Sequence, residues 1–126
     1  MKITIKNRSE QPLYQQIKEQ IKEAILRQEV KGGEKLPSIR SLASDLHVSV
    51  LTTKRVYEEL EKEGFIISIV GKGSFVASEN MEILSESKRY LIEQKLIEIW
   101  IMVKNLGISK EELYMMMDII FEEDDE

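Results

Sequence analysis

The stretch that decides the fold is SIRSLASDLHVSVLTTKRVYEEL, residues 38–60. It predicts two short helices, because apolar side chains recur at helical spacing on either side of His47. Ser38 and Ser49 stand where each helix would begin, and their hydroxyl groups can cap free backbone N–H groups. Histidine tolerates the left-handed backbone conformation of a sharp turn better than most residues do. The stretch is therefore predicted to be a helix-turn-helix, with Thr53 at a position where an aliphatic residue is expected.

The flanking sequence predicts one helix before this stretch and a β-hairpin after it. The first helix begins near Pro12, is expected to end at Gly32-Gly33, and carries one apolar stripe: Leu13, Ile17, Ile21, Ala24 and Ile25. After Gly64, the apolar runs 65–70 and 74–76 flank a Gly-Lys-Gly turn. The predicted fold is a mainly helical α+β fold, a winged helix-turn-helix domain followed by a short two-helix dimerisation region.

The C-terminal part is predicted to be that dimerisation region. Residues 1–78 form the first domain, and residues 79–126 hold a long helix from about Glu82 to Gly107, a second helix opened by the capping box Ser109–Glu112, and an acidic tail. Two helices of this size cannot bury both apolar stripes against each other, so a second copy is expected to cover them. The predicted interface residues are Leu84, Leu91, Leu96, Ile99, Trp100, Val103, Leu113, Met116, Met117 and Ile120.

Charge and composition limit the classes of function that the chain can have. Residues 1–78 carry 13 Lys and Arg against 10 Asp and Glu, whereas residues 79–126 carry 5 against 13, so only the first part is basic. The chain has no cysteine and one histidine, and it has no phosphate-cradling glycine loop, so we expect no metal site, no cofactor and no enzyme activity. No apolar run is long enough for a membrane span, and the polar N-terminus does not resemble a signal peptide, so a cytoplasmic protein is expected.

Several motifs resemble the DNA-binding domain of the GntR family of bacterial regulators. They are GEKLPSIRSLA at residues 33–43, VS at 48–49, YEELEKEGFI at 57–66 and GKGSFV at 71–76. The opening QPLYQQI at residues 11–17 and the short C-terminal part resemble the YtrA type in particular. The resemblance implies a homodimer that binds a palindromic operator in double-stranded DNA, usually to repress its own operon, which often encodes an ABC transporter.

The resemblance also implies roles for individual residues. Arg40 would touch DNA from the start of the second helix, Thr52 and Lys54 would lie on the recognition helix, and the Gly-Lys-Gly turn would enter the minor groove. Ser38 and Ser49 suit phosphate oxygens, because free N–H groups surround them. The predicted DNA-binding residues are Ser38, Arg40, Ser49, Val50, Thr52, Lys54, Arg55, Gly71, Lys72 and Gly73.

Some alternatives stay open at this point. Val50 and Leu51 replace Arg and a polar residue of many relatives, and they either contact thymine methyl groups or pack on Leu46. Arg55 either contacts DNA or pairs with an acidic residue of its own helix. A winged helix used only for protein contact is the competing function. A set of apolar residues in the C-terminal part either forms core and dimer interface or lines a pocket for a small-molecule effector: Trp100, Met102, Tyr114, Met115, Met116, Met117 and Phe121. The sequence does not identify such an effector.

Overall fold

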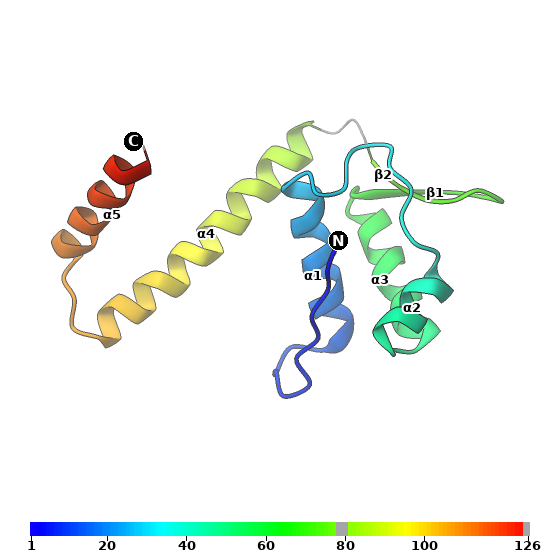
Figure 1. Ribbon diagram of the computed structural model, residues 1–126, viewed down its shortest axis with the longest axis horizontal. Helices are drawn as coiled ribbons and strands as arrows, with labels where there is room; N and C mark the ends of the chain where they lie inside the picture. Colours follow the sequence, from blue (N-terminus) through cyan, green and yellow to red (C-terminus); the bar gives the residue numbers. More distant parts are fainter. Residues whose placement is uncertain (78–80, 125–126) are drawn as a thin grey trace. The chain divides into compact units, whose positions relative to one another are not determined.

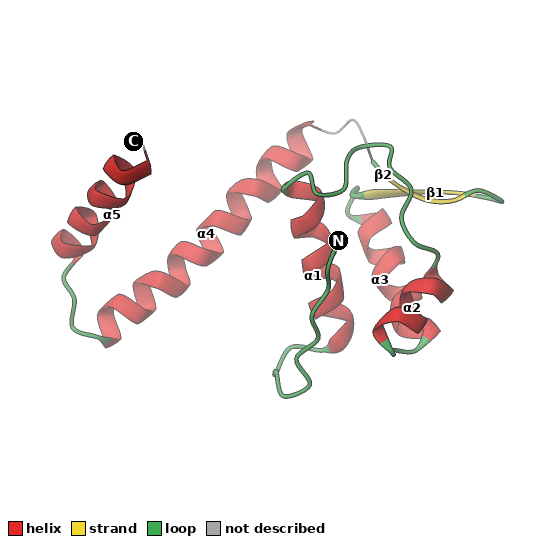
Figure 2. Cartoon of the chain, in the orientation of Figure 1, coloured by secondary structure: helices red, strands yellow, loops and turns green. Residues whose placement is uncertain are grey.

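The computed structural model describes residues 1–77 and 81–124, with side chains for residues 1–77 and 84–124. The elements, in chain order, are α1 (Leu13–Leu26), α2 (Ile39–Leu46), α3 (Val50–Lys62), β1 (Ile66–Ile69), β2 (Gly73–Val76), α4 (Met81–Asn105) and α5 (Lys110–Asp124) (Figures 1 and 2). This arrangement confirms the predicted fold class. The chain divides into two compact units, Met1–Ser85 and Glu86–Glu126, and the junction predicted between residues 78 and 79 lies outside the described residues.

The two helices of the helix-turn-helix begin at the predicted serines. The backbone N–H of Ser41 donates to Ser38 Oγ at 3.0 Å, and the backbone N–H of Thr52 donates to Ser49 Oγ at 3.0 Å. Caps of this kind contribute about 1 kcal/mol each to helix stability. His47 ends α2 with a φ of 56°, in the left-handed region. The predicted starts of both helices and the turn between them are therefore confirmed.

Thr53 is fully buried although its hydroxyl is polar. The hydroxyl donates a hydrogen bond of 3.2 Å to the backbone oxygen of Ser49, one turn earlier in α3. Because this bond satisfies the hydroxyl inside its own helix, a position expected to be aliphatic accepts a threonine without an unpaired polar group.

The core of the first unit forms where α1 and α2 both pack on α3 and where α3 meets β1. Val56 and Leu60 of α3 are completely buried, as their spacing predicts. Leu13 is 39% exposed, so the prediction that it belongs to the buried stripe of α1 is wrong; it is the first residue of the helix, at the end of the stripe. Further core residues are Ile17, Ile21, Ala24, Ile25, Leu42, Tyr57, Phe65, Ile66 and Val76.

Helix α1 ends at Leu26, before the predicted stop at Gly32-Gly33. Gln28 adopts a φ of 60°, and the N–H of Glu29 donates to the backbone oxygen of Ala24 at 2.9 Å, which closes the helix end. The chain then turns back and buries Val30 in the core. The prediction failed because a glutamine seldom takes this conformation, and nothing in the local pattern marks it.

The loop before α2 pairs with the free edge of the β1–β2 hairpin. In the hairpin itself Ile66 pairs with Val76, and Ile69 with Gly73. On the other edge of β2, the N–H of Leu36 donates to the backbone oxygen of Ser74 at 2.9 Å, and the N–H of Val76 donates to the oxygen of Glu34 at 2.9 Å. A lone hairpin is marginal in water, and this extra pairing anchors its base to the body of the unit.

The second unit consists of most of α4 and all of α5. Gly107, with a φ of 73°, follows α4, and the N–H of Glu112 donates to Ser109 Oγ at 3.1 Å, so the predicted cap of α5 is confirmed. Leu84, near the start of α4, packs against the core of the first unit. None of the helices in the described part of the chain is long and apolar enough to cross a membrane.

Candidate nucleic-acid interface

The predicted DNA-binding residues lie at three places in the first unit. Ser38 and Arg40 are at the start of α2, and residues 49–55 run from the N-cap of α3 through its first turns. Residues 71–73 are at the tip of the hairpin, which is called the wing below (residues 66–76). Figure 1 shows the wing projecting from the body of the unit, beyond α2 and α3. None of the predicted DNA-binding side chains is buried, whereas Thr53, which lies among them in α3, faces the core, so all three places are open to a ligand.

The start of α3 is suited to an anion. The N–H groups of its first turn are incompletely paired, and the helix dipole favours negative charge there. Ser49 accepts the N–H of Thr52 and donates its own hydroxyl proton to Thr52 Oγ1 at 2.8 Å, so the two side chains are fixed together at the helix end. This end of α3 carries no acidic residue in its first turn. A phosphate oxygen would therefore meet donors and no repelling charge.

Three exposed cations surround these helix starts and the wing tip. Among the side chains that the structure describes, no carboxylate forms an ion pair with Arg40 or Lys72. Lys54 lies 3.9 Å from Glu58, and both side chains are more than half exposed. Such a surface pair contributes little, so the charge of Lys54 remains available to a phosphate.

The contacts of Arg55 indicate a structural role and not a DNA contact. Its Nε donates to Glu59 Oε2 at 3.0 Å, and its guanidinium lies 3.6 Å from the centre of the Tyr14 ring. The side chain therefore bridges α3 and α1. Of the two alternatives for Arg55, the structure favours pairing within its own helix.

Lysines of α1 neutralise the acidic second half of α3. Lys18 Nζ lies 3.1 Å from Glu59 and 3.3 Å from Glu63, and Lys22 Nζ lies 3.0 Å from Glu63. Burial opposes the charge on Lys18, but its hydrogen bonds and attraction to the two glutamates outweigh burial and raise its pKa. The hydrogen bond from Lys18, with that from Arg55, lowers the pKa of Glu59. Both carboxylates are paired with lysines of α1, which limits their repulsion of DNA.

Val50 and Leu51 do not share one environment. Leu51 is 78% exposed, so it does not pack on Leu46, whereas Val50 is 48% exposed. A leucine left in water at the start of a recognition helix is available for contact with a thymine methyl group. Of the two alternatives, the exposure of Leu51 excludes packing on Leu46, and its contact with a base stays a prediction.

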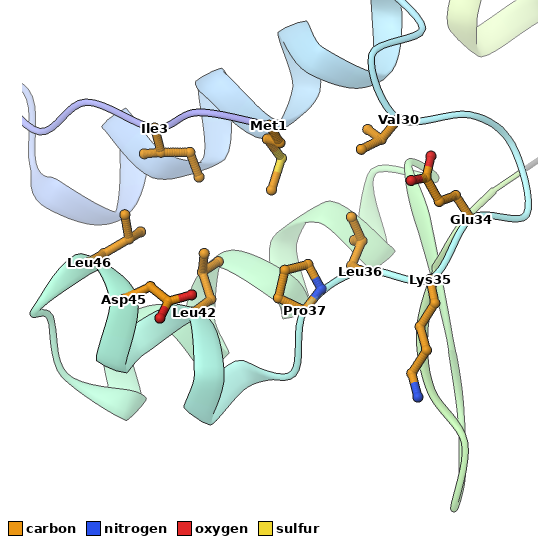
Figure 3. Close-up of a pocket in the computed structure, with 10 residues that line it drawn as sticks. All are labelled: Met1, Ile3, Val30, Glu34, Lys35, Leu36, Pro37, Leu42, Asp45 and Leu46. Atoms are coloured by element: carbon orange, nitrogen blue, oxygen red, sulfur yellow. The ribbon is translucent and has the colours of Figure 1, made fainter.

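Lys35 is not among the contact residues that the sequence predicts. Its backbone forms a bridge with Phe75, which sets it on the outer edge of β2. Figure 3 shows its side chain extending along the hairpin, away from the other labelled residues. No local pattern marks this lysine, because its position depends on pairing between segments about 40 residues apart in the chain, as such non-local β pairing generally does.

A cavity of about 470 Å³ lies between the N-terminal segment, the loop before α2, and α2 itself (Figure 3). Met1 and Ile3 point across it toward Leu42. Hydrogen bonds of 2.8 Å from Gln20 Nε2 to the Thr4 oxygen and from the Thr4 N–H to Gln20 Oε1 hold the N-terminal segment on α1. None of the apolar C-terminal residues considered as an effector pocket lines this cavity.

The second unit leaves most of its apolar side chains exposed. Of the predicted interface residues, Trp100 is 38% exposed, Ile99 43%, and Ile120 55%, whereas Val103 is covered within the single chain. Leu91, Leu113 and Met117 are half-buried, and Leu96 and Met116 are about half exposed. Apolar exposure is not limited to the predicted stripes, because Tyr90, Ile97 and Ile101 of α4 and Tyr114, Met115 and Ile119 of α5 lie at helical positions outside them. Further exposed residues add to the stripes themselves: Ile92, Met102, Leu106 and Phe121.

Comparisons with known proteins agree with this geometry. A family model described as "Bacterial regulatory proteins, gntR family" matches residues 13–76. The chain is 36% identical over 112 residues to the HTH-type transcriptional repressor YtrA of Bacillus subtilis, which covers 89% of this chain and 86% of that protein. A GntR family transcriptional regulator from Listeria monocytogenes superposes with a TM-score of 0.74 at 28% identity, over 87% of this chain and 96% of that one. The DNA-binding domain of AraR in complex with operator ORX1 has a TM-score of 0.55 at 26% identity, over 61% and 96%.

Proposed function

The chain belongs to the gntR family of bacterial regulatory proteins, and from this premise we propose that it is a repressor that binds a palindromic operator as a homodimer. It is a DNA-binding transcription regulator and not an enzyme. The proposal includes a cytoplasmic location, because a bacterial operator is reached there. It rests on two features of the chain, the donors of the first unit and the apolar surface of the second.

The observation that carries the proposal is the arrangement at the start of α3. Ser49 and Thr52 fix a helix end with free N–H groups, and Leu51 stands exposed beside them. The cations Arg40, Lys54 and Lys72 lie on the neighbouring α2, on α3 and on the wing. This combination supplies phosphate contacts that set the position of a helix, together with side chains that can read base edges.

The apolar surface of the second unit supports the homodimer. Monomeric soluble proteins rarely expose apolar patches of many adjoining residues, and both α4 and α5 do so here. A two-fold pairing of second units would cover the same residues on each copy. It would also set two recognition helices against a symmetric site, which is why the proposed operator is palindromic.

The salt dependence of DNA binding tests the proposal. We would measure the affinity of the full chain for a fluorescent random-sequence duplex at a series of salt concentrations. Three cations in each of two copies predict a slope of about −5 for log K against log salt. The Lys62→Gln variant is a matched control, because Lys62 lies at the opposite end of α3 from the predicted contacts.

A flat salt response would contradict the proposal. It would favour the competing function, in which the winged helix contacts another protein and DNA is not the ligand.

A further inference from the structure

We propose that the wing reads the minor groove of A·T base pairs, with Val70 as an apolar wedge and with Lys35 and Lys72 as its cations. This inference rests on the proposed DNA-binding function and deepens it, because it names the class of base pair that the wing selects. It is carried by the turn at the wing tip, by the exposure of Val70 and by the position of Lys35.

The turn at the tip holds Val70 at the apex of the wing. The N–H of Lys72 donates to the backbone oxygen of Ile69 at 3.0 Å, which closes a four-residue turn. Gly71 is the third residue of that turn and has a φ of 78°, as type II turns require. Val70 is therefore the second residue, and its side chain is fully exposed at 101%.

A fully exposed valine at this apex presents an apolar group to whatever the tip of the wing contacts. In the minor groove, a G·C pair presents the guanine 2-amino group, whereas an A·T pair presents only acceptors. An apolar side chain pressed against the amino group would leave that donor unpaired and desolvated, which is costly. Val70 would therefore favour A·T pairs and reject G·C pairs without making a hydrogen bond.

Lys35 adds a cation to the outer edge of the wing. Its Cε would lie 3.0 Å from a Cβ placed on Gly73, so the lysine stem runs closely over that glycine. Gly73 also has a φ of 117°, a conformation that residues with side chains rarely adopt. The backbone of Gly73 is therefore shaped to let Lys35 lie along the hairpin, and the pairing of Lys35 with Phe75 holds it there.

The charge of the wing fits a narrow groove. Residues 65–77 contain no Asp or Glu, and Lys72 stands two residues from Val70. Among the side chains that the structure describes, neither Lys35 nor Lys72 has an ion-pair partner. A·T tracts have a narrow minor groove with enhanced negative potential, which attracts inserted cations. The apolar apex and the two lysines thus select the same kind of DNA.

Three duplexes of equal length test the inference with the full chain: alternating dA-dT, dI-dC and dG-dC. Hypoxanthine lacks the 2-amino group, so dI-dC combines an A·T-like minor groove with a G·C-like major groove. We expect similar affinities for dA-dT and dI-dC, each roughly 5- to 100-fold above dG-dC.

Variants assign the effect to the wing. Val70→Thr keeps the side-chain shape and adds a hydroxyl that can accept from the guanine amino group, so the preference for dI-dC over dG-dC should shrink. Because Val70 is fully exposed, this change leaves the core untouched. Lys35→Gln and Lys72→Gln should each weaken binding to dA-dT and flatten the salt slope by about one unit, whereas the control Lys62→Gln should do neither.

Every other result contradicts either this inference or the proposed function. Equal affinity for dI-dC and dG-dC overturns the inference while leaving DNA binding intact. Preference for dA-dT alone also overturns it, because the reading would then lie in the major groove. Absence of binding to all three duplexes overturns the proposed function itself.

Discussion

The phenolic hydroxyl of Tyr57 on α3 donates a hydrogen bond of 2.6 Å to the backbone oxygen of Pro37, directly before the N-cap of α2. Tyr57 is almost completely buried, and burial raises its pKa to about 12. This bond ties the recognition helix to the start of the preceding helix, where Ser38 and Arg40 lie. Together with the packing of α2 on α3, this hydrogen bond fixes the relative placement of the two helix starts.

Removing this hydroxyl should lower stability in a pH-dependent way. The Tyr57→Phe variant leaves the Pro37 oxygen without its partner and should cost about 1 kcal/mol at neutral pH. In the parent, the pKa of Tyr57 is about 10 in the unfolded chain and about 12 in the folded one. The stability that this raised pKa contributes is complete below pH 10 and falls by about 2 kcal/mol as the pH rises toward 12, because only the unfolded chain ionises in that range. Urea unfolding of both proteins between pH 8 and about 12 measures the difference. Parallel stability curves across this range would disprove the account of Tyr57.

Arg40 and Arg55 should respond oppositely to removal. Arg40→Ala should leave the free energy of unfolding unchanged and weaken operator binding by about 1 to 3 kcal/mol if the side chain reads a base. Arg55→Ala should lower stability by about 1 kcal/mol, because it loses the Glu59 pair and the Tyr14 ring, and should change affinity little. Thermal unfolding and a binding titration on both variants separate the two roles. A large affinity loss in Arg55→Ala with unchanged stability would return Arg55 to the DNA surface.

Alanine substitutions of Gly73 and Gly71 form a matched comparison in the wing. Both have positive φ, but only Gly73 has Lys35 against the place of a Cβ. Gly73→Ala should therefore cost about 1 kcal/mol more than Gly71→Ala in stability, since strain and overlap add. In a Lys35→Ala background the excess should disappear, because the overlap is gone. An excess that persists without Lys35 would show that the lysine does not lie on Gly73.

The second unit should be separable from the first. A chain ending at Ser85 keeps the whole core of the first unit, including Leu84, and should fold as a monomer with weak DNA affinity. In the full chain, Trp100→Glu should produce the same monomer without truncation, because the side chain is part of the exposed apolar surface. Sedimentation velocity on the three proteins reads the mass directly. A truncated chain that still sediments as a dimer would move the interface to the first unit.

Sequence alone predicted the features that depend on neighbouring residues. Ser38 and Ser49 cap their helices, and His47 makes the turn, because each acts within three residues of its own position. Features that depend on tertiary contacts escaped prediction. Gln28 ends α1 with a backbone that its type seldom adopts, and Lys35 reaches the wing only through strand pairing.

For the exposed apolar side chains, too, the sequence predicted the local pattern but not the tertiary environment. Sequence identified Leu51 as a departure from the family pattern, but only its 78% exposure separated packing from contact with a ligand. One apolar stripe was predicted for α4, whereas Ile97 and Ile101 extend the apolar surface around the helix. Helical spacing finds a stripe but does not say how many partners a helix has.

The most direct test of the central claim is a binding selection with the purified full chain on sheared genomic DNA from its source organism. The account predicts enrichment of a two-fold symmetric site whose half-sites are centred about 34 Å apart, or one helical turn, with A·T pairs where the wings enter the minor groove. Recovery of no enriched sequence, or of a site without two-fold symmetry, would contradict it.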